Sequence, residues 1–121
     1  MDIDVGRILD RLEEHSIRDD TLVVFTSDNG FSCGHHGFWG KGNGTYPLNM
    51  YENSIKVPFV VSHPGRINTG IESGMFSAID FMPTLLDYAG VGVPDTLRLP
   101  GKSFARMLDG SAAASRDSVV I

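Results

Sequence analysis

A carboxylate and a carboxamide stand side by side in this chain at Asp28 and Asn29, directly after the hydrophobic run 21–27. Such a run is typical of a buried strand, and ligands of open α/β sheets bind beyond the carboxyl ends of the strands. Carboxylate and carboxamide oxygens suit a hard divalent cation. Lys41 adds a positive charge that can bind an oxyanion beside that cation. The pattern predicts metal-assisted chemistry on a sulfate or phosphate ester.

The same strand end is also compatible with a plain turn. Asp, Asn and Gly tolerate left-handed backbone and hydrogen-bond locally, which is ordinary turn chemistry. A hairpin turn would return at once to a strand, whereas here a loop rich in Gly, His, Asn and aromatic residues is expected over 28–49. Loops of that length are usually functional or disordered, and the aromatic residues argue against disorder. The long loop therefore favours a functional site.

Several short segments follow one another along the chain in a specific order. They are Asp28-Asn29-Gly30, His36–Gly42, Tyr51–Pro58, Ser62–Gly65, Asp80–Gly90 and Gly101–Ser103. Together they resemble the type I sulfatases, which belong to the alkaline phosphatase superfamily, and the resemblance covers nearly the whole chain. One departure is Lys56, where that family usually has arginine before Val-Pro.

The resemblance implies roles for individual residues. Asp28 and Asn29 match metal ligands. Lys41 and His36 match residues that bind the substrate and act in catalysis, Lys41 on a sulfate oxygen and His36 at the departing oxygen. The oxygen-rich ligand pair favours one divalent cation, calcium first and magnesium as the alternative. The implied partner is a small-molecule or glycan sulfate ester.

The nucleophile of type I sulfatases is not among these residues. The family carries it as a formylglycine, made from the cysteine of an N-terminal Cys-x-Pro-x-Arg or Cys-x-Ala-x-Arg motif. The only cysteine here, Cys33, is followed by Gly34-His35-His36. We therefore expect the chain to be a C-terminal part, 1–121, of a sulfatase-like catalytic domain that needs its N-terminal portion. Alone, it should not turn over substrate.

Two other functions stay open. A phosphoric or phosphonic ester hydrolase of the same superfamily would share Asp28 and the sheet, although such enzymes more often use His-rich two-metal sites. A stand-alone binding module without catalysis would need no nucleophile. An upstream, in-frame cysteine motif would distinguish a sulfatase from such a module.

Composition narrows the class of protein. The 121 residues carry a net charge of −5 and are 41% hydrophobic and 21% charged. This balance indicates a globular chain and gives no basic patch for nucleic acid. No apolar run approaches the ~20 residues of a membrane span. Periplasmic, secreted and cytoplasmic locations all stay open.

The hydrophobic pattern predicts an α/β fold in which strands alternate with helices. The resemblance implies that this fold is a partial alkaline-phosphatase-like sandwich with largely parallel strands. Apolar residues recur at helical spacing near the start of the chain, and Asp80 and Gly90 are suitable ends for a second helix. The predicted elements are a helix over 3–15, a strand over 21–27, the active-site loop 28–49, a strand over 57–62, a short strand over 74–79 and a helix over 81–89.

Overall fold

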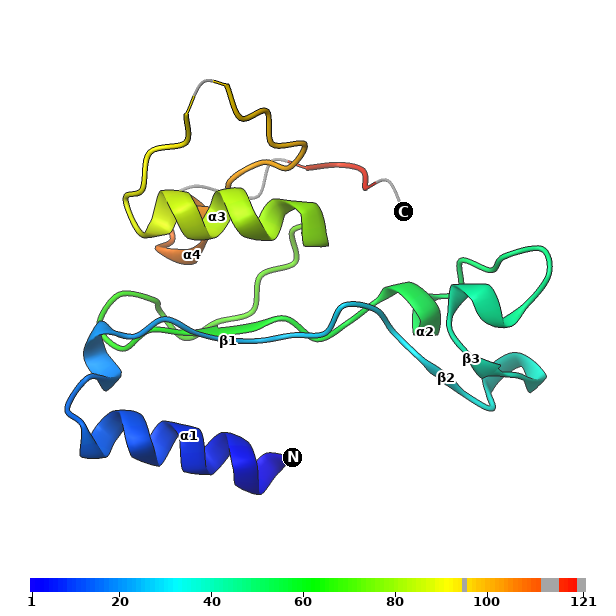
Figure 1. The fold of residues 1–121 in the computed structure, drawn as a ribbon, viewed down its shortest axis with the longest axis horizontal. Helices are drawn as coiled ribbons and strands as arrows, with labels where there is room; N and C mark the ends of the chain where they lie inside the picture. The colour runs from blue at the N-terminus through cyan, green and yellow to red at the C-terminus, as the bar shows by residue number, and fades with distance from the viewer. Residues whose placement is uncertain (95, 112–115, 120–121) are drawn as a thin grey trace. The chain divides into compact units, whose positions relative to one another are not determined.

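A computed structural model describes residues 1–94, 96–111 and 116–119 (Figure 1). Within this part of the chain, residues group into two compact units, one of Met1–Val23 and Val61–Val119, the other of Val24–Val60. The helices are α1 (Asp2–Glu14), α2 (Glu52–Ile55), α3 (Phe81–Tyr88) and α4 (Ala105–Leu108). The strands are β1 (Val23–Phe25), β2 (Ser32–Cys33), β3 (Trp39–Gly40) and β4 (Val60–Ser62). Short 3₁₀ turns are η1 (Arg18–Asp20), η2 (His35–Gly37), η3 (Gly42–Gly44) and η4 (Ala78–Asp80).

The strands form two small sheets. β1 pairs with β4, and β2 pairs with β3 in an antiparallel hairpin. The prediction of a largely parallel sheet is therefore wrong for the residues that the structure describes. Parallel neighbours need a long crossover, usually a helix, whereas the chain between β1 and β4 forms a hairpin, short turns and the four-residue α2. The strand predicted over 74–79 is also wrong, because η4 begins at Ala78 and 74–77 form no strand.

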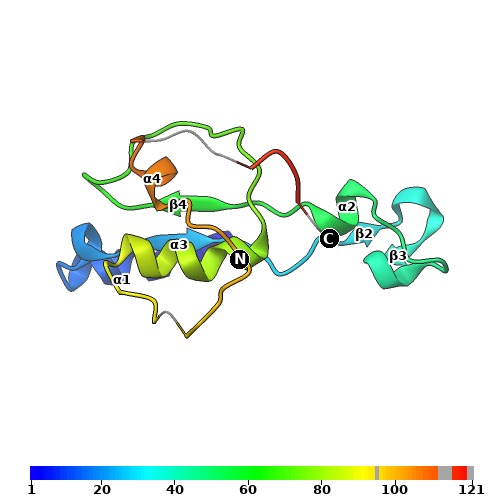
Figure 2. The ribbon, with the colours of Figure 1, turned by 90° about the horizontal axis from the view of Figure 1, so that it is seen from above.

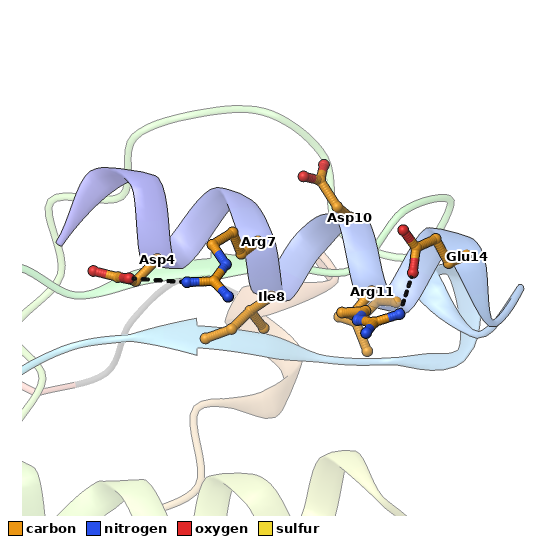
Figure 3. A pocket seen from close by; sticks show the side chains of 7 residues that line it. Asp4, Arg7, Ile8, Asp10, Arg11 and Glu14 are labelled. Carbon is orange, nitrogen blue, oxygen red and sulfur yellow. Dashed lines mark hydrogen bonds and ion pairs between the residues drawn. The ribbon is translucent and has the colours of Figure 1, made fainter.

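Helix α1 carries its charges in pairs along its surface. Asp4 and Glu14 form ion pairs with Arg7 and Arg11, at 4.0 Å and 2.6 Å between nitrogen and oxygen. Figure 3 shows these side chains beside Ile8, around an open hollow lined by residues of α1 alone. No residue of α1 is buried. The helix is amphipathic, as its periodicity predicts, yet its apolar positions stay accessible in the described residues.

The core of the first unit lies where α3 packs against η4 and α4. Phe104 and Ala105 are buried, and the Phe104 ring meets Phe76 edge to face with centroids 5.5 Å apart. The buried Thr84 hydroxyl donates to the Asp80 carbonyl and accepts from the Phe104 amide. Because this hydroxyl satisfies groups on both helices, it fixes α4 against α3.

Asp80 anchors the segments around α3 with its side chain. It is completely buried, and its carboxylate accepts from the amides of Ser77 at 3.0 Å and Lys102 at 2.8 Å. The guanidinium of Arg116 donates to the same carboxylate at 2.5 Å. Charge-assisted hydrogen bonds of this kind are stronger than neutral ones. One buried carboxylate thus caps η4 and ties two distant segments, at Lys102 and Arg116, to the start of α3.

His63, just after β4, links η1 to α3. Its ring is buried, and Nε2 donates to the carbonyl of Asp19 at 2.9 Å. Because a carbonyl only accepts, Nε2 carries the hydrogen of this bond, and the other ring nitrogen, Nδ1, lies 2.8 Å from the Tyr88 hydroxyl. Burial raises the pKa of the Tyr88 hydroxyl, which keeps it protonated as the donor.

Among the described residues, no helix has both the length and the apolar character that a membrane span requires.

The buried carboxylate makes a stability prediction possible. We expect Asp80→Ala to lower the free energy of unfolding by about 3–5 kcal/mol, because it leaves the Arg116 charge buried without its partner. Arg11→Ala, which removes an exposed ion pair on α1, should cost less than about 1 kcal/mol. Urea unfolding of both variants beside the parent protein measures the difference. Equal losses would show that the buried pair contributes no more than a surface pair.

Candidate active site

The residues predicted to do chemistry all lie in the second unit, between β1 and β4. Asp28 and Asn29 follow β1, His36 lies in η2, and Lys41 follows β3. In both ribbon views β2, β3 and α2 lie side by side (Figures 1 and 2). The loop expected over 28–49 thus contains a hairpin and two 3₁₀ turns, and it is an organised element.

Asp28 sits in a local turn that orders its carboxylate. Its Oδ1 accepts from the amide of Asn29 at 2.9 Å and from the hydroxyl of Ser27 at 3.3 Å. The Ser27 hydroxyl lies 3.0 Å from the Asn29 carbonyl oxygen. Turn chemistry and a candidate ligand position therefore coexist here, because the local bonds use one carboxylate oxygen and leave the side chain exposed.

Lys41 and Asn29 meet directly although twelve residues separate them. The Lys41 ammonium donates to Oδ1 of Asn29 at 2.6 Å. The other end of the same amide, Nδ2, donates to the Gly30 carbonyl at 2.8 Å, which fixes the direction of Oδ1. The structure therefore places the predicted oxyanion-binding charge beside the predicted ligand pair.

Asn49 holds this part of the loop together. Its Nδ2 donates to the carbonyls of Lys41 and Gly42, each at 3.3 Å. Its Oδ1 accepts from the Ser54 hydroxyl at 2.7 Å and from the Tyr51 amide at 3.4 Å. One carboxamide thus joins the backbone of Lys41 to the start of α2. Nothing in the sequence distinguishes Asn49 from the other polar loop residues, so sequence reasoning missed it.

Gly30 brings the other half of the loop to α2. Its amide donates to the Ser54 carbonyl at 3.1 Å. A Cβ atom at this position would lie 2.1 Å from the carbonyl oxygen of Asn53. Any larger residue would force the strand end away from α2. The glycine after Asp28 and Asn29 is therefore needed for close approach, beyond its value in a turn.

His36 is placed differently from the other candidates. Its ring stacks on Tyr51, with centroids 3.9 Å apart and planes at 13°. Its backbone φ of 57° lies in the left-handed region, which is uncommon outside glycine. Among the described residues no hydrogen bond, ion pair or ring contact joins His36 to Asp28, Asn29 or Lys41. The structure thus groups Asp28, Asn29 and Lys41 directly, whereas His36 contacts Tyr51.

The donor set fits part of a divalent cation site. Asp28 and Asn29 supply two hard oxygen ligands, whereas calcium takes 6–8. No group of three or more His, Cys, Asp or Glu residues gathers for a metal in the part of the chain that the structure describes. These two residues would hold one side of such an ion, and further ligands must come from outside this group.

The Asn49 network generates a prediction. We expect Asn49→Ala to lower the free energy of unfolding by about 1–3 kcal/mol, because it leaves backbone and hydroxyl partners unpaired. Amide hydrogen exchange over 41–54 should become faster. Asn43→Ala is the matched control, since Asn43 is exposed in η3. Equal exchange rates in the two variants would contradict a central role for Asn49.

Comparison with known proteins matches this chain to sulfatases. The Sulfatase family model matches residues 1–91. An N-acetylglucosamine-6-O-sulfatase of Bacteroides thetaiotaomicron is 36% identical over 97% of this chain, and the multifunctional alkaline phosphatase superfamily protein PehA of Trinickia caryophylli is 35% identical over 74%. The chain spans 20% and 17% of these two relatives.

A solved structure shows the same fold. The structure of BT4656 in complex with its substrate D-glucosamine-2-N,6-O-disulfate matches 96% of this chain and 22% of its own with a TM-score of 0.80 and 35% identity. The predicted resemblance is therefore confirmed at the level of the family. With its family model matched over 1–91 and its fold shared with a sulfated-sugar complex, this chain belongs to the sulfatase family.

Proposed function

We propose that this chain supplies cation-binding and sulfate-binding residues for the hydrolysis of a sulfate ester. The observation that carries the proposal is the 2.6 Å contact between the Lys41 ammonium and Asn29 Oδ1, directly beside Asp28. Cationic and oxygen-ligand groups that lie together can hold an anionic ester and its counter-ion at once. The sulfatase family membership makes sulfate the favoured anion.

In this proposal each residue has a distinct task. Asp28 and Asn29 hold a divalent cation, calcium first and magnesium second, which when bound neutralises charge on sulfate oxygens. Lys41 donates from Nζ to a sulfate oxygen. His36 donates a ring proton to the ester oxygen as the sulfur–oxygen bond breaks, so the product leaves as an alcohol.

The relatives support one class of substrate. One matched relative is named for 6-O-sulfate on N-acetylglucosamine, and the matched structure holds a sulfated glucosamine. We therefore favour a glycan sulfate ester over other small sulfate esters. The formylglycine nucleophile of type I sulfatases belongs to the family's N-terminal motif, so the proposal concerns the full-length enzyme that contains this chain.

One comparison favours a second candidate function. PehA, at 35% identity, is named as a multifunctional member of the alkaline phosphatase superfamily. A site of hard oxygens and one lysine can bind a phosphoric or phosphonic ester as well as a sulfate ester. Parallel assays with p-nitrophenyl sulfate and p-nitrophenyl phosphate on the full-length enzyme separate the two functions. A non-catalytic binding module would turn over neither compound.

A pair of lysine variants tests the proposed function. In the full-length enzyme, Lys41→Ala should lower kcat on a sulfate ester by about 10²–10³-fold, because it removes a charge that stabilises the transition state. The control is Lys56→Ala, whose ammonium pairs with Glu52 at 2.7 Å in an exposed ion pair. Steady-state kinetics and metal analysis of both variants measure whether Lys41 acts in catalysis without affecting metal binding. Near-parental activity in Lys41→Ala would remove the main support for an oxyanion site.

The incomplete ligand set predicts weak metal binding by the 121 residues alone. Two oxygen ligands leave most of the coordination shell of calcium to water. We expect calorimetric titration of calcium into the isolated chain to show weak binding, with a dissociation constant well above the micromolar values of good calcium sites. Asp28→Ala is the control. Tight binding that this substitution abolishes would mean that the described residues form a more complete site than two ligands provide.

A further inference from the structure

His36 is held in an unusual backbone conformation by the turn around it. Its φ is 57°, and its neighbours Gly34 and Gly37 also have positive φ values, 88° and 79°. The hydroxyl of Ser32, which is completely buried, donates to the His35 carbonyl at 2.8 Å and fixes the turn. Non-glycine residues persist in this region only where their surroundings determine it, often at functional sites. The turn therefore fixes the position of the His36 backbone, but it does not fix the orientation of the imidazole ring.

Stacking on Tyr51 determines the orientation of the His36 imidazole ring. The imidazole and the phenol stack with centroids 3.9 Å apart and planes at 13°. No hydrogen bond to either imidazole nitrogen of His36 is formed among the described residues. The orientation of the ring thus depends on the stacking contact. A flat contact restricts rotation of the ring while it leaves both nitrogens accessible at the edge.

Tyr51 is itself well anchored. Its amide donates to Asn49 Oδ1, and its carbonyl accepts from the amides of Ser54 at 2.8 Å and Ile55 at 3.2 Å. The Phe38 ring lies against it with centroids 6.2 Å apart. Tyr51 is therefore fixed at the N-cap of α2. The Asn49 side chain links its amide to the backbone carbonyl of Lys41.

We propose that Tyr51 is a positioning residue for His36, a role that rests on the proposed function in which His36 protonates the departing oxygen. Tyr51 touches neither the cation ligands nor Lys41, so it acts through the direction of the imidazole. The aromatic ring is the part that matters, because the stacking contact is made by its face. The hydroxyl of Tyr51 is dispensable in this role.

Four variants of the full-length enzyme test the proposal. Tyr51→Leu should lower kcat about 10- to 100-fold with little change in KM, since a misdirected group costs this much in rate. It should also flatten the limb of the pH–rate profile that His36→Gln removes. Tyr51→Phe should retain both the rate and the limb. Tyr46→Leu, the same change at a fully exposed tyrosine of the same compact unit, is the matched control.

Each outcome bears on the proposal. A Tyr51→Leu enzyme that loses rate but keeps the parental pH profile would show a merely structural role and overturn the proposal. If Tyr51→Leu does not fold, NMR of the parent protein and of Tyr51→Phe decides, because a stacked phenol shifts the His36 ring protons upfield. Unshifted protons overturn the stacking. Lys41→Ala with full activity would instead overturn the proposed function, while the NMR shift would still report on Tyr51.

Discussion

The candidate site depends on the carboxamide of Asn49. Its two ends bind different parts of the loop, the carbonyls of Lys41 and Gly42 on one side and the start of α2 on the other. It therefore links the segment that carries Lys41 to Tyr51, the residue that stacks on His36. A side chain that is half-buried and fully bonded is well suited to this task, because every polar atom it buries finds a partner.

Around this carboxamide the loop is organised by close backbone approach and not by a hydrophobic core. Gly30 meets the backbone of α2 where a Cβ atom would be excluded, and Ser32 is buried so that its hydroxyl can fix the turn before His36. Aromatic contacts between Tyr51, His36 and Phe38 complete the arrangement. Such a loop is specified by polar and steric fit within the residues that the structure describes.

Sequence reasoning reached the parts of the structure that local patterns encode. Apolar periodicity indicated a helix near the observed α1, and Gly90, whose φ is 68°, ends the region of α3 as expected of a residue after a helix. The parallel sheet was wrong because the partner of a strand is not encoded in the strand itself. Residue types pointed to Asp28, Asn29 and Lys41, whereas Asn49 and Tyr51 matter only through contacts made on folding.

The contact between Lys41 and Asn29 has an electrostatic consequence for the proposed function. A divalent cation bound at Oδ1 of Asn29 would repel the ammonium that donates to the same oxygen, because like charges in close contact repel by several kcal/mol even at an effective dielectric constant near 20. In the proposed function, a cation at this oxygen would therefore favour a turn of Lys41 from Asn29 toward another acceptor. A sulfate dianion or ester beside that cation offers such an acceptor. Its negative charge would offset the repulsion, so the proposed substrate would allow Lys41 and the cation to stay close together.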